Sequence, residues 1–229
     1  MRGILIAAAL VFVLPVLLII LAITHGVGWW FPFILVELLF AKTQISSVRG
    51  AAATFYNRKG LRRLEGGDAA GASKAFARAL GFGQGAVAYV NNLALALLYT
   101  GDLDGARKAI EPAVTTKELK EPMRGVLMST WALVLALQGD VDEARVADEA
   151  AFKQDFSLAS WVIAARERRW PFTKPQEIKG AWARHLYDVL EAYVAGQGYR
   201  DQALDRPLPL GLARALAYRW PEMKAFLGG

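Results

Sequence analysis

The sequence after residue 50 repeats a short pattern, and this repeat limits the possible fold more than any other feature. A Gly-Asp pair stands at residues 67–68, 101–102 and 139–140, so successive pairs are 34 and 38 residues apart. Small residues keep a fixed distance from each pair. They are an alanine five residues after the glycine (Ala72, Ala106, Ala144) and a Gly or Ala twelve residues before that alanine (Gly60, Ala94, Ala132). Because small side chains let helices approach closely, the pattern predicts stacked pairs of antiparallel helices.

The arrangement resembles the tetratricopeptide repeat (TPR) family, whose unit is a helix-turn-helix of about 34 residues. The resemblance covers roughly residues 53–152 and is strongest in the first two units. In the third unit, Asp148 stands where the family has a bulky residue, and a four-residue insertion precedes the unit. The resemblance implies an all-α fold, a TPR-like α-solenoid, with residues 49–152 as about three repeats.

The resemblance also implies where a partner would bind. Members of the family usually hold a peptide in a concave groove lined by the first helix of each unit. Asn92 matches the place where many members hold a peptide backbone, whereas the basic clamp for a terminal carboxylate is absent from this sequence. A mainly neutral groove favours an apolar or neutral segment, of another protein or of this chain's own C-terminal region. The implied groove residues are Asn57, Leu61, Asn91, Asn92, Leu95, Tyr99, Ser129, Thr130 and Leu133.

The N-terminal segment differs in character from the repeats. Residues 4–23 are twenty consecutive residues without a charge, long enough to cross a hydrocarbon core of about 30 Å as a helix. A cleaved signal peptide is the competing interpretation of this run. A shorter apolar stretch over residues 27–45 is either a second span or a helix that lies on the membrane surface. The sequence therefore predicts a membrane anchor over residues 1–48, formed by a transmembrane helix or a helical hairpin.

Positive charge gathers directly behind this segment. The 229-residue chain has a net charge of +6. A basic block beside a membrane segment is typical of a topology determinant or of contact with anionic lipid headgroups. A hairpin places this block on the cytoplasmic side, so we expect an integral protein of the bacterial inner membrane with cytoplasmic repeats. The block accounts for the whole net charge and contains Lys42, Arg49, Arg58, Lys59, Arg62 and Arg63.

Residues 153–229 predict further helices that cap the repeats. The expected helices cover about 156–169, 176–195 and 210–219, and the first and last of them end before a Trp-Pro pair. In the middle helix, apolar residues recur at helical spacing. Because the last unit of a stacked array exposes its apolar face, these helices are expected to cover that face.

Composition excludes several classes of function. The chain has no Cys and only two His, which removes thiolate metal sites and cysteine nucleophiles and leaves little for histidine chemistry. His185, with Asp188 and Glu191 one turn on, has no nucleophile or metal-ligand pair beside it. We therefore expect no enzyme activity, no cofactor and no bound metal. Confinement of the net charge to one block argues against nucleic-acid binding.

These observations predict a membrane-anchored scaffold whose repeats bind or assemble partner proteins. The alternative is an accessory subunit built permanently into a larger membrane protein complex. The two differ in whether the protein exists on its own, because a scaffold recruits its partners reversibly whereas a subunit stays with its complex.

Overall fold

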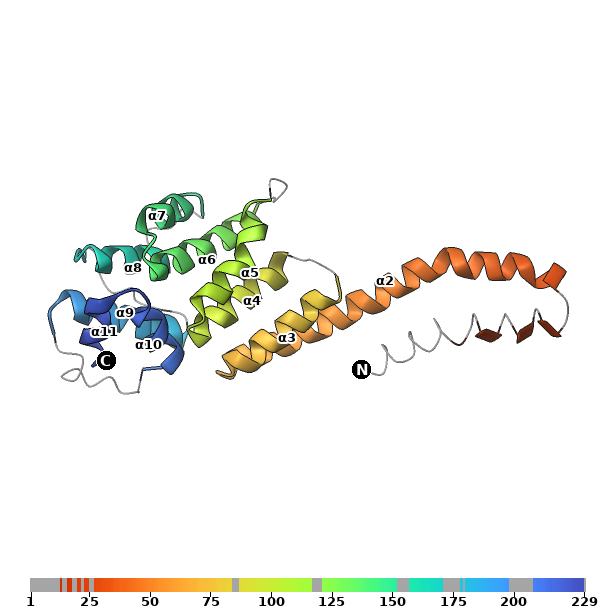
Figure 1. Ribbon diagram of the computed structural model, residues 1–229, viewed down its shortest axis with the longest axis horizontal. Coiled ribbons are helices and arrows are strands. Elements are labelled where there is room, and N and C mark those ends of the chain that lie inside the picture. The colour runs from red at the N-terminus through yellow and green to blue at the C-terminus, as the bar shows by residue number, and fades with distance from the viewer. Residues whose placement is uncertain are drawn as a thin grey trace.

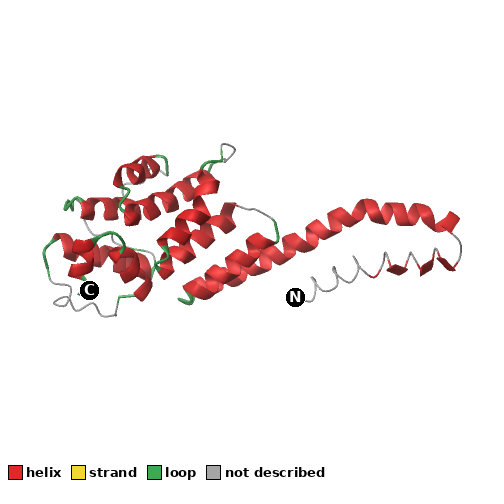
Figure 2. Cartoon of the chain, viewed as in Figure 1, coloured by secondary structure: helices red, strands yellow, loops and turns green. Residues whose placement is uncertain are grey.

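The computed structural model describes residues 13, 16–17, 20–21, 23–24, 27–83, 87–116, 121–151, 157–170, 178, 180–197 and 208–228, with the backbone alone for 27–42 and 44. These residues form α-helices joined by turns and contain no strand (Figure 2), which confirms the predicted all-α class. The helices are α2 (Val27–Glu65), α3 (Ala69–Gly81), α4 (Val87–Thr100), α5 (Leu103–Val114), α6 (Met123–Gln138), α7 (Val141–Glu149), α8 (Leu158–Arg166), α9 (Ala181–Val194), α10 (Leu210–Ala217) and α11 (Pro221–Phe226).

The first six of these helices form three consecutive pairs. The pairs α2–α3, α4–α5 and α6–α7 pack internally, and each pair also packs on the next, while α4 contacts α6 directly. Figure 1 shows the stack, with α2 projecting from the body of the molecule. The helix pairs therefore stack in chain order, as the spacing of the repeats predicts.

The Gly-Asp pairs form the turns inside these helix pairs, for a local physical reason. Gly67, Gly101 and Gly139 have φ of 82°, 82° and 94°, a left-handed conformation that residues with a Cβ rarely adopt. The aspartate that follows caps the next helix: a side-chain oxygen of Asp68 accepts the Gly71 N–H at 2.7 Å, and Asp102 accepts the Gly105 N–H at 2.9 Å. Each glycine thus ends one helix, and in the first two pairs the aspartate begins the next.

The small residues of the repeat lie where helices touch. Ala72, Ala106 and Ala144 are completely buried. A Cβ added to Gly60 of α2 would lie 2.5 Å from Cε1 of Phe76 on α3, closer than carbon atoms pack. The phenyl ring therefore occupies the space that the absent side chain of Gly60 leaves, and the small residue is needed for the contact between α2 and α3.

The C-terminal helices share one core with the second and third pairs. Leu98 of α4, Leu135 of α6, Leu186 of α9 and Leu216 of α10 belong to the same buried cluster. The helices expected over 156–169, 176–195 and 210–219 correspond to α8, α9 and α10, whereas the short helix α11 was not expected. The residues after the repeats thus cover the apolar face that the third pair would otherwise expose.

The predicted membrane anchor is contradicted. In the part of the chain that the structure describes, no helix combines the length and the apolar character needed to span a membrane. Residues 4–23 lie largely outside the described residues. Residues 27–45, the expected second span, begin a helix that does not end there: α2 continues to Glu65 and crosses the expected boundary at residues 48–49 without a break. The predicted hairpin and the predicted location in a bacterial inner membrane are therefore wrong.

Candidate protein-binding groove

The structure divides the predicted groove residues into two sets. The open half of the groove, as we call the first set, consists of Asn57 and Leu61 on α2 and Asn92 and Leu95 on α4. Leu61 is 37% exposed and the other three are half-buried. The Nδ2 of Asn92 donates a hydrogen bond to Oδ1 of Asn57 at 3.0 Å. This amide pair joins the first helices of two neighbouring units, and Leu61 lies one helical turn beyond Asn57 on α2.

The second set is covered by the protein itself. The ring of Tyr99 at the end of α4 stacks on Trp182 of α9, with centroids 4.9 Å apart and an interplanar angle of 17°. Burial raises the pKa of Tyr99 above its ordinary value. A Cβ on Gly211 of α10 would collide with the carbonyl oxygen of Tyr99, so α10 approaches the backbone of α4 closely. The C-terminal helices therefore occupy this end of the predicted groove.

The remaining predicted groove residues are mostly withdrawn from solvent. Thr130 and Leu133 of α6 are buried, and Ser129 is half-buried. Asn91 of α4 is only 5% exposed, and its Oδ1 has no hydrogen-bond partner in the described part of the chain. Because a ligand in the groove touches exposed atoms, Asn91, Thr130 and Leu133 are not available for direct contact in this structure.

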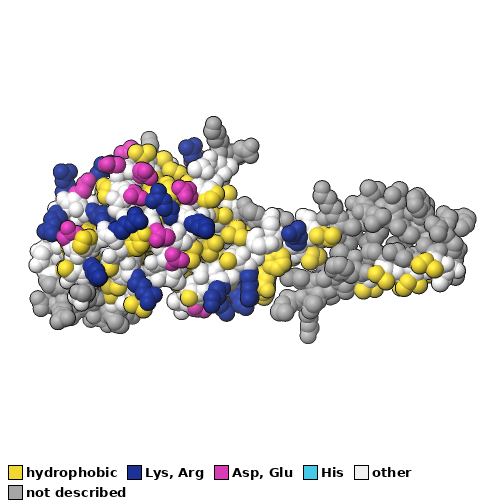
Figure 3. Space-filling model, viewed as in Figure 1, with side chains coloured by type: hydrophobic (Ala, Val, Ile, Leu, Met, Phe, Trp, Pro, Cys, Tyr) yellow, Lys and Arg dark blue, Asp and Glu magenta, His cyan; other side chains and the backbone are white. Residues whose placement is uncertain are grey.

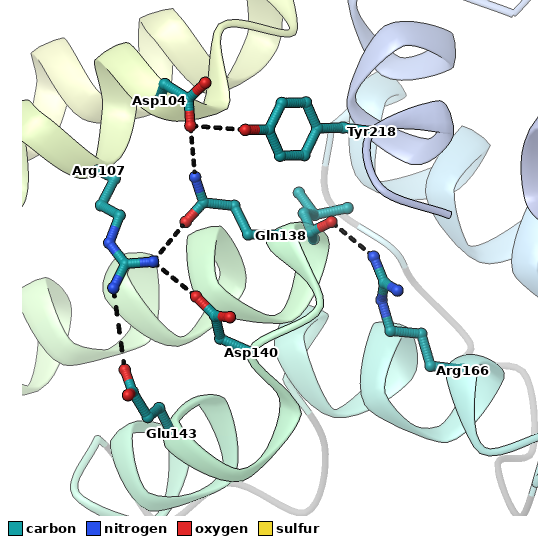
Figure 4. Close-up of polar contacts among 8 residues, drawn as sticks. Asp104, Arg107, Gln138, Asp140, Glu143, Arg166 and Tyr218 are labelled. Carbon is teal, nitrogen blue, oxygen red and sulfur yellow. Dashed lines mark hydrogen bonds and ion pairs between the residues drawn. The ribbon is translucent and has the colours of Figure 1, made fainter. Parts of the chain in front are cut away.

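A network of polar side chains fixes the C-terminal helices to the repeats (Figure 4). The hydroxyl of Tyr218, just after α10, donates to Oδ1 of Asp104 on α5 at 2.7 Å, and Nε2 of Gln138 donates to the same oxygen at 3.1 Å. Arg107 donates to Oε1 of Gln138 at 3.1 Å and to Oδ2 of Asp140 at 2.6 Å. The hydrogen bond to Asp104 is the main reason that the pKa of Tyr218 is raised. We call these five residues the polar clasp.

A second polar contact, also drawn in Figure 4, anchors α8 to α6. The guanidinium of Arg166 donates to the carbonyl oxygens of Ala136 and Leu137 at 2.8 and 2.7 Å. Those carbonyls belong to the last turn of α6, where helical hydrogen bonds run out. The same guanidinium lies 4.3 Å from the ring centroid of Trp220, and burial lowers its pKa. Arg166 thus connects α6, α8 and the start of α11.

The polar clasp and the Tyr99–Trp182 stack were missed by the sequence reasoning. Asp104 looks like an ordinary acidic residue in the first turn of a helix, and Trp182 like an ordinary core position on an amphipathic helix. Their partners Tyr218 and Tyr99 are 114 and 83 residues away, respectively. The aromatic richness of the C-terminal helices was the available signal, because large aromatic side chains need a partner surface.

The basic block lies on α2. Arg49, Arg58 and Arg62 are exposed, Lys59 is half-buried, and the side chain of Lys42 is outside the described residues. Arg63 differs from the others, because it donates to the carbonyl oxygen of Gly71 at 3.2 Å and pairs with Asp68 at 3.7 Å. Contact of this block with anionic lipid headgroups stays a prediction.

We also looked for groups of metal-binding side chains and for similarity to known proteins. Among the described residues, no three His, Asp or Glu side chains are close enough to share a metal ion. Comparisons of the chain with protein-family models, curated proteins and solved structures find no match.

Proposed function

We propose that this chain is a protein-binding scaffold without catalytic activity, which holds a short segment of a partner protein in the open half of the groove. The observation that carries the proposal is the Asn57–Asn92 amide pair beside the exposed Leu61. The TPR resemblance, which stays a prediction, supports the same position, because it places peptide binding on the first helix of each unit.

The amide pair leaves hydrogen-bonding capacity for a ligand. Each asparagine side chain has two N–H donors and one carbonyl acceptor, and the pair uses one donor of Asn92 and the acceptor of Asn57. In the described residues, the amide nitrogen of Asn57 and the amide oxygen of Asn92 have no other partner. A peptide backbone offers the matching C=O and N–H groups. The pair therefore suits recognition of main chain rather than of a particular side chain.

The extent of the open half limits the size of the ligand. Leu61 and Leu95 supply apolar surface on α2 and α4, but Tyr99 is already covered by Trp182. A ligand therefore contacts the first two units and ends before the C-terminal helices. We expect a short segment with one or two apolar side chains and no requirement for charge.

Site-specific photocrosslinking in cells tests the proposal. A photoreactive amino acid replaces the exposed Thr54, which lies on α2 one turn before Asn57 and Arg58, and a control places it at the exposed Lys108 on α5. We expect a discrete adduct with a different protein, and not with a second copy of this chain, from position 54 only. Asn57→Ala combined with Asn92→Ala should weaken the interaction by about tenfold or more, since two lost anchors of about 1 kcal/mol each multiply in affinity.

Two results would count against a groove. One is an adduct from position 54 that the double Asn variant leaves unchanged, and the other is the absence of any adduct specific to position 54. Tyr99 is unsuitable as a probe, because its replacement would disturb the packing of α9.

A further inference from the structure

We propose that copies of this chain associate head to tail, with a basic face of α2 in one copy against an acidic face of α7 in the next. The basic face consists of Arg58, Lys59 and Arg62. The acidic face consists of Asp142, Val146 and Glu149. The association goes beyond the proposed function, because it uses neither the amide pair nor Leu61 of the open half of the groove.

The basic face of α2 carries charge that the rest of the described chain does not compensate. Residues 49–81 contain seven basic and two acidic side chains, a net charge of +5. Within the described residues, Arg58, Lys59 and Arg62 have no hydrogen bond or ion pair, whereas the adjacent Arg63 has both. Positions 58, 59 and 62 share one side of the helix, and like charges four residues apart repel each other. An anionic surface against this face would relieve that repulsion.

The acidic face of α7 has the opposite composition. Residues 140–149 contain five acidic residues and one basic residue, a net charge of −4. The basic residue, Arg145, pairs with Glu167 on α8 at 2.6 Å and, at the longer distance of 3.6 Å, with Asp142. Val146 is 68% exposed, and Asp142 and Glu149 lie on the same side of the helix, four residues before and three after it. The side chain of Asp142 is fully exposed. This face is therefore an uncovered aliphatic side chain flanked by carboxylates.

The two faces are complementary in chemistry. Arginine guanidinium groups form paired hydrogen bonds with carboxylates, so Arg58 and Arg62 suit Asp142 and Glu149. The aliphatic stems of long basic side chains cover apolar surface while their charged ends stay at the rim, which provides a cover for Val146. The contact thus combines charge pairing with burial of an exposed valine.

The positions of the two faces in the fold make the contact one between copies. The basic face belongs to the first helix pair and the acidic face to the third, toward opposite ends of the stack (Figure 1). On the face of the molecule that Figure 3 shows, basic and acidic side chains are interspersed over the body, in contrast to the one-sided charge of α2. Each copy has one basic and one acidic face. When two copies associate through unlike faces, the pair still has one free basic face and one free acidic face, to which further copies can bind.

Sedimentation velocity of the full chain over a range of protein and salt concentrations tests the proposal. We expect species larger than a dimer to grow with protein concentration and to dissociate with added salt, because exposed charges are screened within about 10 Å at 0.1 M ionic strength. Arg58→Glu with Arg62→Glu, and separately Asp142→Arg with Glu149→Arg, should each weaken association by about tenfold or more. Lys108→Glu with Arg124→Glu is the matched control, since both are exposed cations that belong to neither face.

Mixing the two reversed variants gives the decisive measurement. Each variant alone carries two faces of the same sign, but one variant has two acidic faces and the other two basic ones, so an equimolar mixture should recover association. Circular dichroism of each variant establishes that the helices are retained. A wild-type chain that stays monomeric at low salt, a mixture that does not associate, or a loss confined to the arginine variant would overturn the proposal.

Failure of the self-association proposal can be distinguished experimentally from failure of the proposed binding function. Because position 54 lies one turn before Arg58 on α2, an adduct there can join two copies of the chain. Asp142→Arg with Glu149→Arg changes only α7, so it should remove such a homotypic adduct and leave an adduct with another protein unchanged. Conversely, Asn57→Ala with Asn92→Ala should leave self-association intact.

Discussion

The first helix pair and the C-terminal part of the molecule are stabilised differently, although both are built from α-helices. Between α2, α3 and α4, the buried cluster is small and centres on Phe76 with Ala72 and Ala96. In the C-terminal part, α4 to α11 share one continuous core that includes Trp161 and Leu190. Each helix from α4 to α11 buries apolar side chains against at least one other helix of that core. The first pair instead has fewer neighbours, so its helix faces remain accessible for a ligand.

This difference indicates that stability and binding are separated along the chain. In a stacked array, each unit is stabilised by its neighbours, and a terminal unit has only one. The C-terminal helices supply the missing neighbour for the third pair, where Arg166 of α8 donates to the carbonyl oxygens of Ala136 and Leu137 on α6. They also cover the end of α4, where Trp182 stacks on Tyr99. No described helix does the same for the outer side of α2. We therefore expect the first pair to open more readily than the shared core.

The largest effect is expected from Trp220→Ala in the shared core. Trp220 is 4% exposed, and its ring packs edge-on against Tyr193 at 5.4 Å. Removing the ring should lower the free energy of unfolding by about 3–5 kcal/mol, the usual cost of a buried aromatic. Urea denaturation measures the loss, and hydrogen exchange should show reduced protection from α4 to α11 together. Leu210→Ala, at a residue 66% exposed on α10, should cost less than about 0.5 kcal/mol. Loss of protection in α11 alone would contradict a shared core.

A smaller and more local effect is expected from Gly60→Val in the first pair. The added side chain must displace the ring of Phe76, since even its Cβ would lie 2.5 Å from that ring. Overpacking of this kind costs about 1–3 kcal/mol. Hydrogen exchange should accelerate in α2 and α3 and remain unchanged in α8 to α11. Gly50→Val in the same helix is the matched control, because a Cβ at Gly50 meets no atom within 4 Å. Equal effects of the two substitutions would contradict close packing at Gly60.

The smallest effect is expected from Tyr218→Phe in the polar clasp. The hydrogen bond to Asp104 raises the pKa of Tyr218 in the folded protein. The bond therefore stabilises the fold below the ordinary tyrosine pKa of about 10, and this stabilisation is lost as pH rises through the raised value. Tyr218→Phe should cost less than about 1 kcal/mol at neutral pH, because the contact is near the surface. Melting temperatures measured against pH should converge for the two proteins in strong alkali. If the difference in melting temperature between the two proteins stays constant with pH, the hydrogen bond donated by the Tyr218 hydroxyl is not the source of the stabilisation.

The repeated part of the chain was predictable because its signals are local. A glycine with positive φ and an aspartate that caps the next helix act within a few residues, so the turns at Gly67 and Gly101 follow from the sequence alone. The burial of Ala106 follows from the same register. Helices α8, α9 and α10 were also expected, since apolar periodicity and Trp-Pro stops are local features.

The errors and omissions arose where a local pattern has two physical outcomes. An apolar run over residues 27–45 is compatible with a membrane span, but α2 continues through Arg49 to Glu65 as one helix. From the sequence, the side chain of Tyr99 could line an open groove or pack inside the core. Which of the two occurs depends on the position of Trp182, which stacks on it. The sequence gives the apolar face of a helix, but not which distant helix covers it. Of the predicted groove residues, those on α2 together with Asn92 and Leu95 on α4 therefore remain accessible, where partner binding stays a prediction, whereas Tyr99 lies under the C-terminal helices.

The contact of α10 with α4 has a consequence for how the chain folds during synthesis. Stacked repeats rely on contacts between neighbours in sequence, which form quickly. The hydrogen bond from Tyr218 to Asp104 instead joins residues 114 positions apart, so it can form only after the ribosome has released the chain through residue 218. Domains are synthesised from the N-terminus at about 5–20 residues per second. Tyr99 therefore lacks its cover of Trp182 for several seconds on each nascent chain, and a chaperone that binds apolar helices can bind there during that interval.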